Sequence, residues 1–124
     1  MCTEVISMVD MAKAKGLAKA ISKEDGISSA TLVSRSGMYV AGDVPQGAHA
    51  ETFVAMAAIL LGSGETAATE INEGLKSINV ILNKSRLLIR GVTEKTLIVV
   101  HADKDMESEA LEKILDKHLK GVEE

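Results

Sequence analysis

The sequence predicts an α+β fold in which three helices pack on a mostly antiparallel sheet. Helical and strand-like patterns follow one another in the order α-β-β-α-β-β-β-α along 124 residues. Short links join neighbouring strands, as hairpins require, and no internal repeat or low-complexity tract interrupts the pattern. We expect one domain over residues 1–124, because this length suits a single hydrophobic core.

The first half of the chain predicts a helix followed by a β-hairpin. Apolar side chains recur at steps of three and four over residues 4–23, with Thr3 as a candidate N-cap. Gly26 is expected to be a left-handed residue that ends the helical region. Two β-prone runs within residues 27–42 flank Gly37, which supplies the positive φ of a tight turn. The loop DVPQGAH follows.

The second half predicts a long helix, three strands and a final helix. The long helical pattern covers about residues 49–72, and residues 75–103 read as three strands with turns at NKS and TEK. The final helix is expected over about residues 106–120, capped by Asp103 or Asp105. Its apolar side comprises Leu111, Ile114, Leu115, His118 and Leu119.

A glycine motif inside the long helical pattern raises the question of nucleotide binding. Gly62, Gly64 and Ala67 have the G-x-G-x-x-A spacing of a dinucleotide-binding turn. Such a turn needs a strand before it and a helix beginning at the glycines, so that phosphate meets free N–H groups. Here the glycines follow a helical run, and no acidic residue ends a second strand about twenty positions later. We therefore expect no nucleotide cofactor.

The same helical segment is apolar on two sides. One stripe is expected to cover the chain's own sheet: Phe53, Ala57, Leu60, Gly64, Ala67 and Ile71. The opposite side is apolar as well over the first half of the helix, and a helix that is apolar all round must be buried all round. We expect a second protein chain to cover it, with small residues allowing close approach of a partner helix. The alternative is that the glycines are merely tolerated near a helix end.

The strand patterns also indicate an interface between chains. Residues 77–82 alternate, as an edge strand does, and free backbone groups at such an edge invite pairing with another chain. Residues 96–101 do not alternate, as expected of a central strand that is buried on both faces. A helix and an edge strand that both need cover predict a two-fold dimer. The expected interface comprises Val54, Ala55, Ala58, Ile59, Gly62, Ser77, Ile78, Asn79, Val80 and Ile81.

The residue composition argues against several other functions. A net charge of −4 without a basic stripe, and the absence of Trp, disfavour nucleic-acid binding. The longest apolar run, residues 53–61, is far shorter than a membrane span, and no secretory signal opens the sequence. From the short apolar run we expect no membrane binding. The single Cys2 fits a reducing compartment, so we expect a cytoplasmic protein.

No arrangement of residues indicates catalysis or a metal site. His101 and Asp103 share a strand face, but a zinc site needs three or four ligands, and His49 and His118 have no paired cysteine. The sequence contains neither a G-x-S-x-G elbow nor a P-loop. We therefore expect no enzymatic activity, no catalytic residues, no cofactor and no metal.

The segment DGISSATLVSRSGMYVAGDVP resembles the roadblock family, which includes the dynein roadblock light chains. That family has an opening helix, a glycine before the first strand, an L-V-x-x-x-G hairpin and a helix rich in small residues. The matching positions are Gly26, then Leu32, Val33 and Gly37, then residues 49–70. The three closing strands also resemble those of the family, so the likeness covers about residues 5–120.

This resemblance implies an α/β/α sandwich with a five-stranded antiparallel sheet in the order 2-1-5-4-3. The second helix is expected on one face of the sheet and the terminal helices on the other. Family members form homodimers, or heterodimers with a paralogous roadblock subunit, through the second helix and the third strand. The resemblance thus implies the same interface as the residue patterns do.

The resemblance also implies a function, because prokaryotic relatives regulate or bind Ras-like small GTPases. We expect a non-enzymatic dimeric regulator or scaffold of such a GTPase, with Glu51, Glu65 and Thr69 as candidate partner-binding residues. An arginine finger would have to come from Arg35, Arg86 or Arg90, and a regulator can instead stabilise one GTPase conformation. The alternative function is a dimerisation adaptor of a larger complex without a direct GTPase role.

Overall fold

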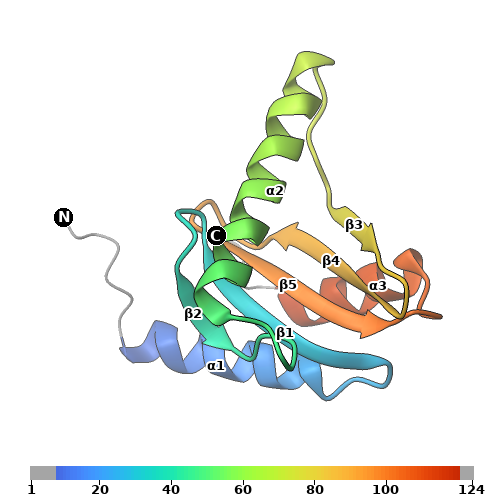
Figure 1. The fold of residues 1–124 in the computed structure, drawn as a ribbon. Coiled ribbons are helices and arrows are strands. Elements are labelled where there is room, and N and C mark those ends of the chain that lie inside the picture. The colour runs from blue at the N-terminus through green and yellow to red at the C-terminus, as the bar shows by residue number, and fades with distance from the viewer. Residues whose placement is uncertain (1–7, 121–124) are drawn as a thin grey trace.

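The computed structural model describes residues 8–120, which form three helices and five strands (Figure 1). The elements are α1 (Met8–Ser22), β1 (Ile27–Ser34), β2 (Tyr39–Gly42), α2 (Ala50–Glu70), β3 (Ile78–Ile81), β4 (Ser85–Gly91), β5 (Thr96–Asp103) and α3 (Ser108–Leu119). Their order is the predicted one. The candidate N-cap Thr3 lies outside the described residues.

The five strands form one antiparallel sheet in the order β2-β1-β5-β4-β3. The central strand is β5, whose side chains point alternately into two separate apolar cores. Leu97 and Val99 face one core, and Ile98 and Val100 face the other. Burial on both faces explains why this strand lacks the alternation of an edge strand. The predicted strand order and the central position of β5 are confirmed.

The helices cover the two faces of the sheet unequally. Helices α1 and α3 lie side by side on one face, where Ile21, Leu111 and Leu115 are completely buried. Helix α2 lies alone on the other face (Figure 1). This arrangement is the α/β/α sandwich that the sequence predicted, with a much smaller helical layer on the α2 side.

Two turns have the backbone conformation that the sequence predicted, and one helix begins differently. Gly26 and Gly37 adopt φ values of +89° and +93°, which glycine tolerates without strain. Helix α3 begins after Glu107, so the prediction of Asp103 or Asp105 as its cap was wrong. Asp103 is the last residue of β5, and its N–H donates to the Gly26 carbonyl oxygen. It therefore lies too far before Ser108, the first residue of α3, to cap that helix.

Helix α2 extends well beyond the sheet on which it packs. Its buried residues are Val54, Ala57 and Leu61, all in the first two thirds of the helix. The remainder projects away from the sheet, and the segment after it returns to β3 (Figure 1). We call residues 62–77, which comprise the end of α2 and this returning segment, the arm.

Candidate protein-interaction site

The outer side of α2 exposes large apolar side chains. Met56, Ile59 and Leu60 are 49%, 56% and 43% exposed, and together they form what we call the crest of α2. Single exposed apolar residues are common on protein surfaces, but three on adjacent turns of one helix form a patch. The crest is therefore a candidate contact surface.

An apolar groove adjoins the crest. A cavity of about 160 Å³ lies between α2 and strands β4 and β5. Its lining side chains are all apolar: Phe53, Met56, Ala57, Leu60, Leu87, Ile89 and Val99. Met56 and Leu60 belong to both the crest and the groove, so the two features form one continuous apolar surface.

The predicted orientation of α2 on the sheet was right only in part: Phe53, Ala57 and Gly64 lie on the sheet side, whereas Ala67 and Ile71 are exposed. The fully buried side chains of α2 are Val54, Ala57 and Leu61, whereas Leu60 is half-exposed at the groove. Val54, expected at the dimer interface, is only 1% exposed and belongs to the chain's own core. The helical wheel averaged over the whole pattern, but the side chains of α2 that are fully buried against the sheet all precede the arm.

Small residues of α2 admit contacts within the chain. Ala55 and Ala58 are half-buried beside the β1–β2 turn, where a Cβ on Gly37 would lie 3.4 Å from the Ala55 Cα atom. A Cβ on Gly64 would lie 2.8 Å from Ile78 Cδ1. In contrast, a Cβ on Gly62 would have no described heavy atom within 4 Å. Among these positions, Gly62 is therefore the one whose small size the described chain does not itself use.

Strand β3 supplies the edge of the sheet next to the groove. Ile78 and Val80 point towards the α2 core, whereas Asn79 and Ile81 point to the opposite face, as the alternation predicted. Ile81 is 67% exposed. The Asn79 side chain is held by its own chain, because its Oδ1 accepts a hydrogen bond from Ser108 Oγ at 2.9 Å. Ser77 is half-buried just before the strand.

Comparison with known proteins identifies the family. Residues 13–102 match the family model described as the Roadblock/LC7 domain, which covers well over half of the sequence. The chain belongs to this family. A comparison of the sequence with curated proteins gave no match.

Solved structures share the fold of this roadblock domain. MglB from Myxococcus xanthus has a TM-score of 0.83 at 15% identity, covering 95% of this chain and 90% of that one. The gliding protein MglB from Thermus thermophilus has a TM-score of 0.80 at 16% identity, with coverage of 94% and 90%. A Roadblock/LC7 domain from Streptomyces avermitilis has a TM-score of 0.76 at 19% identity, with coverage of 87% and 92%.

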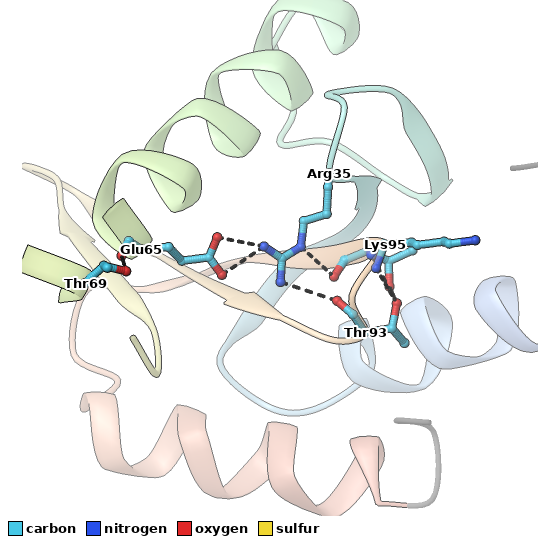
Figure 2. A network of polar contacts seen from close by, with 6 residues as sticks. Arg35, Glu65, Thr69, Thr93 and Lys95 are labelled. Carbon is cyan, nitrogen blue, oxygen red and sulfur yellow. Dashed lines mark hydrogen bonds and ion pairs between the residues drawn. The ribbon is translucent and has the colours of Figure 1, made fainter. Parts of the chain in front are cut away.

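Two of the three candidate partner-binding residues make contacts inside the roadblock domain. Glu65 forms an ion pair with Arg35 at 2.8 Å, and Thr69 Oγ1 donates to the Glu65 carbonyl oxygen at 3.0 Å (Figure 2). Glu51 is exposed in the first turn of α2. Sequence reasoning did not find the Arg35–Glu65 pair, because the two residues are 30 positions apart and nothing local links them.

All three arginines bind other groups of the same chain. Arg86 donates to the Met106 carbonyl oxygen and, at 2.8 Å, to Ser108 Oγ. Arg90 forms ion pairs of 2.8 Å with Glu112 and Asp116 of α3. With Arg35 paired to Glu65, each candidate for an arginine finger already has a structural role in this conformation.

The histidines lie apart from one another in polar contacts. His101 Nε2 lies 2.9 Å from Ser85 Oγ, His49 Nδ1 lies 3.0 Å from Thr52 Oγ1, and His118 Nε2 lies 2.6 Å from Glu24 Oε2. Within residues 8–120, no three His, Cys, Asp or Glu side chains gather as metal ligands would. Cys2 lies outside the described residues.

The glycine motif lies inside a helix, as its context predicted. Gly62 and Gly64 are interior residues of α2, so their N–H groups do not form the start of a helix.

By length and composition, α2 is also apolar enough to cross a membrane, with a mean hydropathy of 1.3 over 18 residues of which 17% are buried. The uninterrupted apolar run of residues 53–61 is too short to reveal this property of the whole helix.

Proposed function

We propose that this roadblock domain is a dimeric, non-enzymatic regulator of a Ras-like small GTPase. The observation that carries the proposal is the continuous apolar surface of the α2 crest and groove beside the free edge of β3. A second copy of the chain would cover this surface, because a two-fold contact brings the same patch from each subunit together.

The proposed interface differs from the sequence expectation in the residues of α2. We add Met56 and Leu60 to the interface, because both are exposed and line the groove. We remove Val54, which is buried in the chain's own core. Ala55 and Ala58 contact the β1–β2 turn, so only their exposed parts could contact a partner. Strand β3 carries no charged side chain or proline, which leaves its edge open to pairing. The residues retained from the expectation are Ile59, Gly62, Ser77, Ile78, Asn79, Val80 and Ile81.

The regulatory part of the proposal comes from the family to which the chain belongs. The resemblance implies regulators of Ras-like GTPases among prokaryotic members, and the surface of the paired α2 helices is the expected docking site. Because the three arginines are held in contacts within the chain, we propose that the protein stabilises one GTPase conformation without an arginine finger. We place this activity in the cytoplasm, on the ground of the single cysteine.

A charge in the groove tests the dimer. Leu60→Glu would bury an unpaired carboxylate in each half of the interface, at a cost of several kcal/mol. Sedimentation velocity should show a concentration-dependent dimer for the wild type and a monomer for the variant. Lys113→Glu, an exposed position on α3, is the matched control and should remain dimeric. A wild-type protein that stays monomeric at high concentration would contradict the dimer.

Direct binding tests the regulatory role. The purified protein should retain Ras-like GTPases from its own organism in one nucleotide state, and the rate of GTP hydrolysis or of nucleotide exchange should change. If no GTPase binds in either the GDP-bound or the GTP-analogue-bound state, the regulatory proposal fails. Affinity capture that returns partners other than GTPases would then favour the adaptor function.

A further inference from the structure

Arg35 is held in place by hydrogen bonds from both its backbone and its guanidinium group. It follows β1 directly, and its backbone N–H donates to the Lys95 carbonyl oxygen at 2.8 Å. Its guanidinium group donates through Nη2 to the Thr93 carbonyl oxygen at 3.3 Å and through Nε to the Thr96 carbonyl oxygen at 3.4 Å. Arg35 is therefore fixed to the turn between β4 and β5 (Figure 2).

The remaining face of the guanidinium group contacts α2. Nη1 lies 2.8 Å and 2.9 Å from the two carboxylate oxygens of Glu65, and charge-assisted bonds of this length are the stronger kind. We call these contacts the Arg35–Glu65 clamp. The clamp links three segments that are distant in sequence: the β1–β2 turn, the β4–β5 turn and the arm.

A glycine in the sheet makes room for the clamp. A Cβ on Gly91, the last residue of β4, would lie 2.5 Å from Arg35 Nη2, which is closer than two such atoms can approach. Gly91 does not adopt a positive φ, so its backbone does not require glycine. The space that the missing side chain leaves is the space that the guanidinium group fills.

The position of the clamp along α2 gives it a specific consequence. Leu61 is the last residue of the helix that is buried against the sheet, and Glu65 lies one turn further, beyond this buried part. On the β3 side, Gly64 packs against Leu75 and Ile78, which return from the end of the arm. On the side of α2 away from β3, the clamp connects the arm to the β1–β2 turn.

We infer that Arg35 is a positioning residue whose clamp on Glu65 sets the direction in which the arm leaves the sheet. Because the crest and the first part of the arm belong to one helix, the clamp thereby sets the geometry of the dimer; this consequence rests on the proposed function. The side chains of Arg35 and Glu65 are 31% and 41% exposed, so solvent weakens their attraction. The clamp acts on direction far more than on the stability of the domain.

A distance measurement tests this inference in the full chain. Spin labels at Thr66→Cys in the arm and Lys113→Cys on α3, with Cys2→Ser and an excess of unlabelled protein, report the direction of the arm within one chain. Glu65→Gln and Arg35→Lys should shift or broaden this distance. Gly91→Ala should do the same, because the added methyl group displaces the guanidinium group. Glu70→Gln, exposed on the same helix, is the matched control.

The same variants link direction to assembly. All three clamp variants should raise the dimer dissociation constant several-fold while their urea midpoints stay close to that of the wild type. An unchanged distance and an unchanged dissociation constant in folded clamp variants would overturn the inference. A wild-type protein that remains monomeric would contradict the proposed dimer instead. The distance between the two spin labels within one chain would then test the role of the clamp by itself.

Discussion

Glu24 shows how one side chain links the two helices that share one face of the sheet. It lies in the turn after α1, and its carboxylate is 2.8 Å from Lys117 Nζ and 2.6 Å from His118 Nε2 on α3. The hydrogen bonds from Lys117 and then His118 lower the pKa of the Glu24 carboxyl group below its ordinary value of 4.5. A carboxyl group whose pKa is lowered by folding stabilises the folded state while it is ionised.

We predict that Glu24→Gln lowers stability at neutral pH but not in acid. In the wild type this stabilisation is complete above the unfolded-state pKa, near 4.5, and disappears as the pH falls through the lower folded-state value. The variant lacks it at every pH. Urea unfolding at pH 7 and in acid should therefore show two proteins that differ at pH 7 and converge below. Asp25→Asn, at the exposed neighbouring position, is the control. A difference that persists in acid would contradict the assignment.

The two glycines of α2 look alike in sequence and have different surroundings. Gly64 is packed against Ile78 Cδ1 and Leu75, whereas a Cβ on Gly62 would meet no heavy atom of residues 8–120 within 4 Å. Glycine costs a helix interior about 1 kcal/mol relative to alanine. Sequence patterns identify such positions as costly without telling which neighbour requires the small residue.

We predict different outcomes for alanine at these two positions. Gly62→Ala should raise the free energy of unfolding of the monomer by up to about 1 kcal/mol, because helix propensity improves and no described contact opposes the methyl group. Gly64→Ala should gain less or lose stability, since Ile78 and Leu75 must move. Both values come from urea unfolding at low protein concentration. Equal gains at the two positions would show that the Gly64 contact is unimportant.

At the scale of the elements, sequence periodicity identified every helix and strand but gave the orientation of α2 only in part. The wheel correctly placed Ala57 on the sheet, but it missed the fully buried Leu61, and Leu60 is half-exposed at the edge of the contact, where it lines the groove. Periodicity gives the angle between residues, and the direction of the sheet depends on tertiary contacts that only part of this helix makes. Strand β5 was easier to place, because a strand buried on both faces lacks alternation wherever its neighbours lie.

Leu61→Ala and Leu60→Ala form a matched pair within α2. Truncating buried Leu61 should lower the free energy of unfolding by about 2–5 kcal/mol, because it leaves a cavity in the core. Leu60→Ala should have a small effect on the unfolding of the monomer and should weaken association instead. Chemical unfolding at low concentration and sedimentation at high concentration separate the two effects. Similar unfolding losses would place Leu60 in the core of the single chain.

At the scale of the whole molecule, local patterns predicted the fold class, and the family resemblance added the strand order. The contacts that hold α2 in place were beyond both, because Arg35, Glu65 and Gly91 meet only after the sheet has formed. Ion pairs between distant residues depend on strand register and helix direction, which no local signal encodes. Of the crest, the sequence named only Ile59 as an interface residue, and it placed Leu60 on the chain's own sheet.

The proposed dimer predicts a melting temperature that depends on concentration. Association stabilises the folded state by mass action, so the Tm of the wild type should rise with protein concentration. The Tm of Leu60→Glu should stay constant over the same range, because its interface carries a buried charge. Differential scanning calorimetry over a hundredfold concentration range measures both. A wild-type Tm that does not move would count against the dimer.

The hydropathy of α2 has a further consequence for the newly made protein. Helix α2 is long and apolar enough to cross a membrane, yet few of its residues are buried in the single chain. A single subunit therefore exposes an apolar surface of the kind that chaperones and proteases recognise. The proposed dimer therefore predicts that copies without a partner turn over faster than dimeric ones. The abundance of this protein in the cell would then follow the supply of whatever molecule shields that helix.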